Sequence, residues 1–489
     1  MLGQCFLSLL TIVAVAVAVP YKNVVYFMEW GSVVQSAPIF SLDWSRITHI
    51  NYAFGKLQPD GSIAFNDTNV AFNLRYPGDG NDPSSVYGQF GQANQLKKKF
   101  RGTKFGLSIG GWTWSDQFSG LFSTDAGRKT FVRNAMTLLT DLGLDFIDID
   151  WEYPVEGGND APPVPHRPDD MANYIAVLKE FRKAFASLPF KAELSVASPA
   201  GPANYGHWDF AGICAQLDHI NIMAYDLAGD WSEYTDHQAN LYADPKHPND
   251  GTSFSIDRAV QDYIRGGCPS TKIVLGIPVY GRSFENTKGL YATFTKPTNG
   301  SWVAPSGDGL GTWDYKVLPL PGATEYYDAV VGAAYSYDAT TKMFVSYESP
   351  TSMAAKLQYI KKNNLGGTMF WAGDADAPAT SARSLITQAY NFYGRNNMAL
   401  YANNLEYPTS KYSNVRGNGT LAPTAVPSPT PSTVLPTPAP TTAPTTAPTS
   451  APAFVCGTNH NVCFWPLTQQ VLPYGKDDCV KFTAFVWCA

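Results

Sequence analysis

The sequence predicts an α/β protein: a closed (β/α)8 TIM barrel with an inserted small α+β domain, followed by a disordered Pro/Thr linker and a small disulfide-rich module. Three observations predict this architecture. Short apolar strands alternate with segments of helical periodicity, one strand carries three alternating carboxylates, and the composition changes abruptly near residue 420. With 489 residues, 44% of them hydrophobic, the chain can hold one large domain and a smaller one.

The barrel is predicted from the order of segments between residues 21 and 400. Strand-like segments span residues 24–30, 47–54, 104–110, 145–152, 192–198, 219–225, 273–279 and 367–371. Helical periodicity spans residues 128–142, 171–186, 256–265 and 352–362. Strands that alternate with helices form a parallel sheet, and eight such strands close into a barrel.

Residues 284–347 interrupt this alternation. The segment is far longer than an ordinary strand-to-helix loop, and it is rich in Tyr, Gly and short strand-like pieces. We therefore predict that it forms the inserted α+β domain, on the rim of the functional site.

Residues 1–18 are predicted to be a secretory signal peptide. An apolar run ends there in Ala16-Val17-Ala18, whose small residues suit cleavage after Ala18, and the run is short for a membrane span. We therefore expect a secreted, extracellular protein, with sequons at Asn66, Asn299 and Asn418 that could carry glycans.

Residues 421–453 consist almost only of Pro, Thr, Ala and Ser, which predicts an extended tether. The segment after it, residues 454–489, is too short to fold on a core alone but holds four cysteines and many aromatic residues. Two disulfides of open pairing and a carbohydrate-binding role are expected. A disulfide knot without ligand stays an alternative, whereas metal binding lacks the CxxC spacing.

Two further cysteines, Cys214 and Cys268, each precede a predicted strand, so both lie at the amino-terminal end of the barrel. A structural bridge between them is expected. The net charge of −6 and the lack of a basic run argue against a nucleic-acid partner. We expect no membrane partner, no metal or other cofactor, and a monomer.

The acidic strand, residues 145–152, reads Asp-Phe-Ile-Asp-Ile-Asp-Trp-Glu. Side chains alternate along a strand, so Asp148, Asp150 and Glu152 share one face, and the apolar residues between them share the face that packs against helices. Same-face positions are about 6–7 Å apart, so three full charges would repel one another. At least one acid should hold a proton near neutral pH, and the set should titrate as a coupled unit.

Functional residues of such barrels gather at the carboxyl ends of the strands. The strand ends here carry Ser108-Ile109-Gly110-Gly111-Trp112, Asp150-Trp151-Glu152, Met223-Ala224-Tyr225-Asp226, Tyr280-Gly281-Arg282 and Trp371. These motifs, in this order and with the pattern Asp145-x-x-Asp148-x-Asp150-x-Glu152, resemble the glycoside hydrolase family 18 chitinases, and the branch with an inserted domain. Phe146 and Val25 stand where that family commonly has Gly, at positions that affect packing more than chemistry.

The resemblance implies a chitinase that cuts β-1,4 bonds between N-acetylglucosamine units of chitin or chitooligosaccharides. In this family the substrate's own acetamido group attacks the anomeric carbon, giving an oxazolinium intermediate and net retention. Glu152 would be the general acid and base, Asp150 would bind the acetamido N–H, and Asp148 would share a proton with Asp150. Tyr225 would hold the acetamido oxygen.

The resemblance also implies a set of substrate-binding residues. Trp371 would form the apolar floor beneath the distorted sugar, and Trp112 and Trp231 would stack on sugars on the leaving-group side. The complete set is Ser108, Trp112, Tyr26, Phe54, Met223, Asp226, Trp231, Arg282 and Trp371. Arg282 could instead only pair with an acid of the inserted domain.

Two other functions remain open. The first is a chitin-binding lectin on the same barrel, although such relatives typically lose the acid that Glu152 supplies here. The second is a hydrolase that cuts the chitobiose core of N-glycans, against which the long insertion and clustered tryptophans favour a linear polymer. Endo or exo action is likewise open.

Overall fold

The computed structural model describes residues 19–34, 36–247, 254–304, 307, 309–417, 455–456 and 463–464. The chain divides into two compact units, Met1–Gly419 and Thr420–Ala489. In the second unit, β15 (Val455–Cys456) pairs antiparallel with β16 (Cys463–Phe464). The predicted signal peptide, the linker and the rest of the predicted C-terminal module lie outside the described residues.

The first unit is built on a closed barrel of parallel strands, as the sequence predicts. Its strands are β1 (Lys22–Met28), β2 (His49–Leu57), β4 (Lys104–Gly110), β5 (Phe146–Asp150), β6 (Glu193–Pro199), β7 (His219–Met223), β8 (Ile273–Pro278) and β14 (Gly367–Trp371). Their spatial order is β1-β14-β8-β7-β6-β5-β4-β2, and β1 pairs with β2 to close the ring. The two-residue β3 (Ile63–Ala64) adds a short antiparallel extension to β2.

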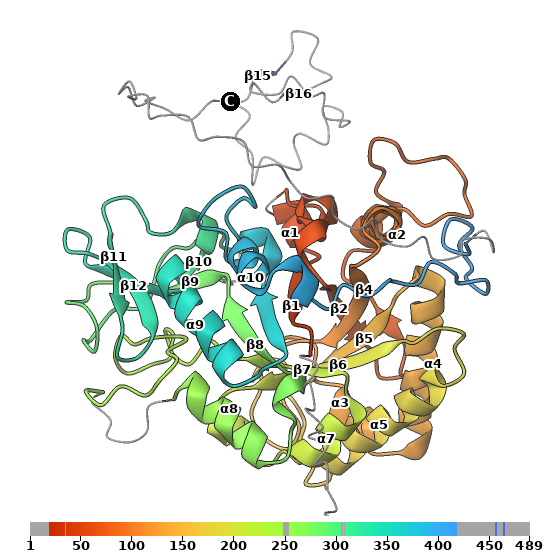
Figure 1. Cartoon of the computed structure of the whole chain (residues 1–489), viewed down its shortest axis with the longest axis horizontal. Helices are drawn as coiled ribbons and strands as arrows, with labels where there is room; N and C mark the ends of the chain where they lie inside the picture. Colours follow the sequence, from red (N-terminus) through yellow and green to blue (C-terminus); the bar gives the residue numbers. More distant parts are fainter. Residues whose placement is uncertain are drawn as a thin grey trace, which may run out of the picture. The chain divides into compact units, whose positions relative to one another are not determined.

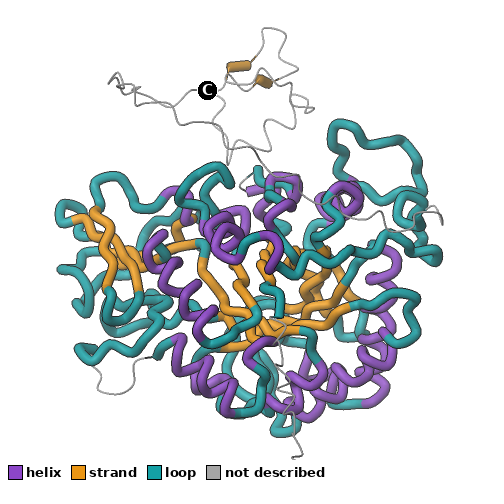
Figure 2. The backbone as a smooth tube through the Cα atoms, in the orientation of Figure 1, coloured by secondary structure: helices purple, strands orange, loops and turns teal. Residues whose placement is uncertain are grey.

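Helices surround the strands, which lie inside them in Figures 1 and 2. They are α1 (Gly31–Val34), α2 (Gly88–Lys99), α3 (Phe118–Phe122), α4 (Asp125–Leu142), α5 (Asp170–Phe185), α6 (Pro202–Tyr205), α7 (Phe210–Gln216), α8 (Ile256–Arg265), α9 (Pro350–Lys362) and α10 (Leu385–Tyr393). Local sequence sets their ends: the Thr124 side chain accepts a bond from the Gly127 N–H at the start of α4, and Gly143 ends that helix at φ 71°, a conformation that glycine adopts without strain.

The predicted insertion is a separate antiparallel sheet, seen in Figure 1 beside the barrel. Its strands are β9 (Tyr280–Phe284), β10 (Thr312–Asp314), β11 (Thr324–Asp328), β12 (Ala333–Asp338) and β13 (Met343–Tyr347), in the spatial order β10-β9-β13-β12-β11. The sheet starts at Tyr280, immediately after β8, so Arg282 lies on its strand β9 rather than on the barrel.

Cys214 in α7 and Cys268 after α8 form a disulfide, which confirms the predicted bridge. It closes a separation of 54 residues between two neighbouring parts of the barrel's outer layer. Within the described ranges, the structure contains no helix long and apolar enough to cross a membrane.

Candidate active site

The acidic strand places its carboxyl groups inside the barrel, as expected. Asp148, Asp150 and Glu152 are 0%, 3% and 7% exposed. On the outer face, Trp151 packs among Phe118, Phe122 and Tyr174, with ring centroids 5.3–5.6 Å away. The apolar outer face and acidic inner face predicted from the alternation are therefore both present.

The strand itself is shorter than predicted, because β5 ends at Asp150 rather than at residue 152. The Asp150 carbonyl accepts a bond from the Gly111 N–H at 2.7 Å, and the Glu152 N–H donates to Ser115 Oγ at 2.8 Å. The turn after β4 thus holds the chain beyond Asp150, and it fixes the backbone that carries Glu152.

Asp148 lies at the centre of a dense hydrogen-bond network. Its Oδ2 accepts bonds from the Tyr26 and Ser108 hydroxyls, both at 2.7 Å. Its Oδ1 accepts from Ser195 Oγ at 2.5 Å and from Asn221 Nδ2 at 3.4 Å. Burial raises the pKa of Asp148, and these donors oppose the rise because they stabilise the ionised form.

Asp150 and Glu152 accept fewer hydrogen bonds than Asp148 does. Burial, the Glu152 charge and the Asp148 charge hold the pKa of Asp150 well above its usual range, which favours its protonated form. Burial raises the pKa of Glu152 to about 7, while a hydrogen bond from Tyr153 lowers it and the Asp226 charge raises it. Glu152 can therefore both donate and accept a proton near neutral pH.

Asp226 and Arg282 form a bidentate ion pair. Arg282 Nε and Nη2 lie 2.8 and 2.7 Å from the Asp226 carboxylate oxygens, and the Tyr280 hydroxyl donates to Asp226 Oδ1 at 2.8 Å. Asp226 follows β7 of the barrel, so the alternative that Arg282 pairs with an acid of the inserted domain is wrong. The pair joins the barrel to the inserted sheet, and the Arg282 guanidinium also lies 5.3 Å from the Trp231 ring centroid.

An aromatic group lies at the carboxyl ends of β1, β2 and β14. Trp371 stacks on Phe54 at 5.4 Å and meets the edge of Tyr26 at 5.4 Å. Trp30 packs against both Trp371 and Phe54, at 6.3 and 6.4 Å. These rings form a continuous apolar surface beside the Tyr26 hydroxyl, which binds Asp148.

The other predicted residues divide between buried and exposed positions. Tyr225 is buried and its hydroxyl contacts Met369 Sδ at 3.8 Å, while Met223, at the end of β7, is half-buried. Trp112 and Trp231 are 51% and 57% exposed, so both rings are available to a ligand. The structure therefore places the acids and Tyr225 inside the barrel and these two tryptophans at its surface.

Comparison with known proteins identifies the family of this site. Residues 22–376 match the sequence profile of Glycosyl hydrolases family 18. The chain belongs to this family. It is 41% identical to "Chitinase 1" of Aphanocladium album over 401 residues, which cover 81% of this chain and 90% of that protein. It is also 41% identical, with the same coverage, to "Endochitinase 1" of Metarhizium robertsii.

Solved chitinase structures agree with the fold. The catalytic domain of the psychrophilic chitinase B from Arthrobacter TAD20 matches with a TM-score of 0.70 and 30% identity, over 76% of this chain and 95% of that one. Chitinase ChiA74 from Bacillus thuringiensis matches with a TM-score of 0.69 and 30% identity, over 76% and 70% of the two chains.

Sequence reasoning missed several residues of this family 18 site. Ser195 on β6 and Asn221 on β7 reach Asp148, and Trp30 extends the aromatic surface. Tyr280 was named within a strand-end motif, but its bond to Asp226 was not predicted. Signals existed for two of them. For Ser195, parallel pairing aligns Ser108, Asp148 and Ser195 across β4, β5 and β6. Trp30 was visible as an aromatic residue at the end of the first predicted strand.

A second polar cluster lies at the amino ends of the barrel strands. His49, Glu193 and His219 are buried and bring their possible ligand atoms within 4.8 Å of one another. His49 Nε2 lies 2.8 Å from Glu193 Oε2, and Lys104 forms an ion pair with the other oxygen of that carboxylate. Because Lys104 and Lys22 place positive charge beside these groups, the cluster is poorly suited to a metal cation.

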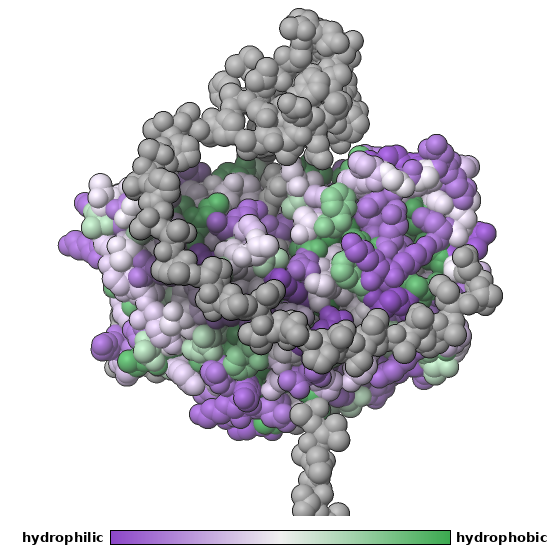
Figure 3. All heavy atoms as spheres, turned by 45° about the horizontal axis from the view of Figure 1, so that its top comes forward, coloured by the Kyte–Doolittle hydropathy of each residue, from purple (hydrophilic) through white to green (hydrophobic). Residues whose placement is uncertain are grey.

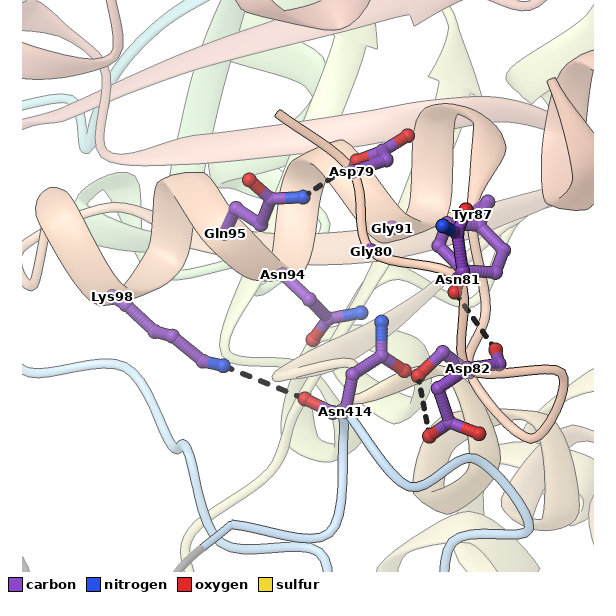
Figure 4. A pocket seen from close by; sticks show the side chains of 11 residues that line it. Asp79, Gly80, Asn81, Asp82, Tyr87, Gly91, Asn94, Gln95, Lys98 and Asn414 are labelled. Atoms are coloured by element: carbon purple, nitrogen blue, oxygen red, sulfur yellow. Dashed lines mark hydrogen bonds between the residues drawn. The ribbon is translucent and has the colours of Figure 1, made fainter. Parts of the chain in front are cut away.

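Outside the barrel, a hollow of about 240 Å3 lies beside α2 (Figure 4). Its lining groups are engaged with one another: Gln95 donates to Asp79 at 2.9 Å, and Lys98 Nζ lies 3.5 Å from the Asn414 carbonyl. Where the face in Figure 3 is uncovered, hydrophobic residues form small groups among hydrophilic ones. We assign no ligand to the hollow.

Proposed function

We propose that this chain is a chitinase, which hydrolyses β-1,4 bonds between N-acetylglucosamine units with retention of configuration. The observation that carries the proposal is the environment of Glu152. It is a buried acid whose pKa is raised to about 7, at the end of the strand that carries Asp148 and Asp150. Such an acid can protonate a leaving oxygen and then accept a proton from water.

The neighbouring carboxyl groups favour the substrate-assisted route. The pKa of Asp150 is raised by burial and by the neighbouring acids, and Asp226 is occupied by Arg282 and Tyr280, so both are poorly suited to act as a free carboxylate nucleophile. Family 18 is an exception to the two-carboxylate scheme, because the substrate's acetamido group attacks the anomeric carbon. Asp150 then binds the acetamido N–H, and Tyr225 holds the acetamido oxygen in line.

The aromatic surface and the exposed tryptophans supply the sugar contacts. Trp371, supported by Phe54 and Tyr26, lies beneath the ring at the cleavage point, and Met223 and Ser108 complete the walls. Trp112 and Trp231 stack on sugars on the leaving-group side. Near the cleavage point, Arg282 donates hydrogen bonds to sugar oxygens, and Asp226 accepts them from sugar hydroxyls.

The rest of the chain fits a protein that works outside the cell on chitin. We propose that residues 1–18 direct secretion, that residues 421–453 act as a tether, and that residues 454–489 bind chitin and raise the local enzyme concentration. Adsorption to insoluble chitin by the full chain, compared with a chain ending before residue 421, tests the last role. Equal adsorption by both chains contradicts it.

The first experiment is anomer-resolved chromatography of the products formed from a chitin hexasaccharide. We expect shorter oligosaccharides with β configuration, and their sizes distinguish internal from terminal cutting. A relative at 41% identity is an endochitinase, so we expect internal cutting. A hexasaccharide that binds but stays intact supports the lectin instead, and cleavage confined to the chitobiose core of a glycopeptide supports the N-glycan hydrolase.

A further inference from the structure

The hydrogen bonds to Asp148 come from four strands and saturate both carboxylate oxygens. Tyr26 and Ser108, on β1 and β4, donate to Oδ2, while Ser195 and Asn221, on β6 and β7, donate to Oδ1. All of these donors and Asp148 itself are at most 1% exposed. A carboxylate that accepts several such bonds in a dry interior is held in its ionised form.

Asp150 has the opposite surroundings, although it lies on the same face of the same strand. Its Oδ1 is buried and has no hydrogen-bond partner among the residues that the structure describes. An ionised carboxylate without donors is costly in such a site, whereas a protonated one is tolerated. The single proton that two neighbouring acids share is therefore better placed on Asp150.

We propose that Ser195 and Asn221 are positioning residues that complete the donor set of Asp148, so that Asp148 stays ionised and the shared proton stays on Asp150. This inference rests on the proposed function, in which Asp150 lies beside Glu152 and accepts a hydrogen bond from the acetamido N–H. Ser195 is the stronger member, because its hydroxyl lies 2.5 Å from Asp148 Oδ1 and the Asn221 amide lies at 3.4 Å.

Among its hydrogen-bond donors, Ser195 has the largest effect on the pKa of Asp148. Burial raises the pKa of Asp148, and the hydrogen bond from Ser195 opposes this rise more than those from Ser108 and Tyr26. The titratable groups around Asp148 are Tyr26 on β1, Asp150 and Glu152 on and after β5, Tyr174 on α5, Tyr225 after β7, and, one layer toward the amino end, His49, Glu193 and His219.

The test is the pH dependence of kcat/KM of full-length Ser195→Ala on a chitin hexasaccharide. The acid limb of the profile reports a second proton entering the Asp148–Asp150 pair, and the alkaline limb reports Glu152 near pH 7. Loss of a hydrogen bond to an ionised group changes a pKa by about one unit. We expect the acid limb to move up by about one pH unit, while the alkaline limb moves less.

The matched control is Thr368→Val on β14. This substitution also removes a buried hydroxyl, which donates to Asn23 Oδ1 at 2.7 Å and does not contact the acids. It should lower thermal stability and leave both limbs in place. Ser195→Cys, which keeps the volume but is a weak donor, should move the acid limb in the same direction by a smaller amount and serves if the alanine variant does not fold.

The outcomes separate this inference from the proposed function. A wild-type chain that leaves the hexasaccharide intact overturns both. If the wild-type chain hydrolyses it with retention but the acid limb of the Ser195 variants coincides with that of wild type, only the inference is overturned. The same holds if both Ser195 variants lose activity equally at every pH, as expected for a purely structural residue.

Discussion

Each end of the barrel buries a polar cluster that contains a glutamate, and the two clusters shift the pKa of that glutamate in opposite directions. At the carboxyl ends, Glu152 lies beside two aspartates, and burial raises its pKa to about 7. At the amino ends, burial would also raise the pKa of Glu193, but His49 and Lys104 hold it well below its usual range. The difference shows that partner charge, rather than burial, decides which glutamate can exchange a proton and which one stabilises the fold.

Replacing the glutamate at the carboxyl end should have the largest effect on activity. Glu152→Gln keeps the shape of the side chain but removes the exchangeable proton, so we expect kcat to fall by about 10²–10⁴-fold. Oligosaccharide affinity should be retained and thermal stability should not fall, since a neutral amide replaces a group that burial already disfavours as an anion. Hydrolysis assays and calorimetric binding to a chitin hexasaccharide check this, and near-wild-type turnover would contradict the assignment.

The same substitution at the amino end should have the reverse outcome. Glu193→Gln leaves the Lys104 ammonium buried without its counter-ion, and removing one partner of a buried ion pair costs about 3–5 kcal/mol. We expect that loss in the free energy of unfolding, measured by urea denaturation, with kcat of the folded fraction unchanged. Unaltered stability together with reduced kcat would mean that the amino-end cluster acts on the chemistry.

The pH dependence of stability should also have opposite signs at the two ends. The folded-state pKa of Glu152 is raised from 4.5 to about 7, so the stability linked to it is complete below about pH 4.5 and is lost as the pH rises through 7. A shift of this size corresponds to about 3 kcal/mol. The pKa of Glu193 is lowered, so its contribution is present above about pH 4.5 and is lost as the pH falls.

Urea denaturation measured from pH 8 down to well below pH 4.5 tests both signs. Relative to wild type, Glu152→Gln should gain stability as the pH rises toward 8, and the deficit of Glu193→Gln should shrink as the pH falls below about 4.5. Stability curves that run parallel to wild type at every pH would show that neither glutamate has the shifted pKa described here.

The sequence predicts one of these clusters and not the other, because only one of them leaves a pattern within a single segment of the chain. The period-two acids of β5 revealed the carboxyl-end cluster, because alternation within one strand is a local property. The Cys214–Cys268 bridge followed from two positions relative to predicted strands. The amino-end cluster was not predicted: His49, Glu193 and His219 belong to β2, β6 and β7, and only the closure of the barrel brings β2 close to the other two strands.

The same limit explains the partial prediction of the candidate site. Ser108 and Tyr26 were named through motifs, whereas Ser195 and Asn221 stand in runs that look like ordinary buried strands. Arg282 was expected near the site, but its partner Asp226 lies 56 residues earlier in the chain. The end of β5 was misplaced because side-chain and backbone bonds from the turn after β4, rather than strand propensity, hold Asp150 and Glu152.

The smallest expected effect concerns two exposed rings, one near each cluster. Trp231 and Tyr401 are both 57% exposed, and each lies near a cation of its cluster, Arg282 at 5.3 Å and Lys104 at 5.8 Å. Trp231→Ala should raise KM for a chitin hexasaccharide about fivefold with little change in kcat, because stacking of a sugar on an aromatic ring is worth about 1 kcal/mol. Tyr401→Ala should leave both constants unchanged, since the proposed sugar-binding residues lie at the carboxyl end of the barrel. Equal changes in KM for the two variants would show that exposed aromatic residues bind the polymer wherever they occur, and that the carboxyl end holds no special sugar site around Trp231.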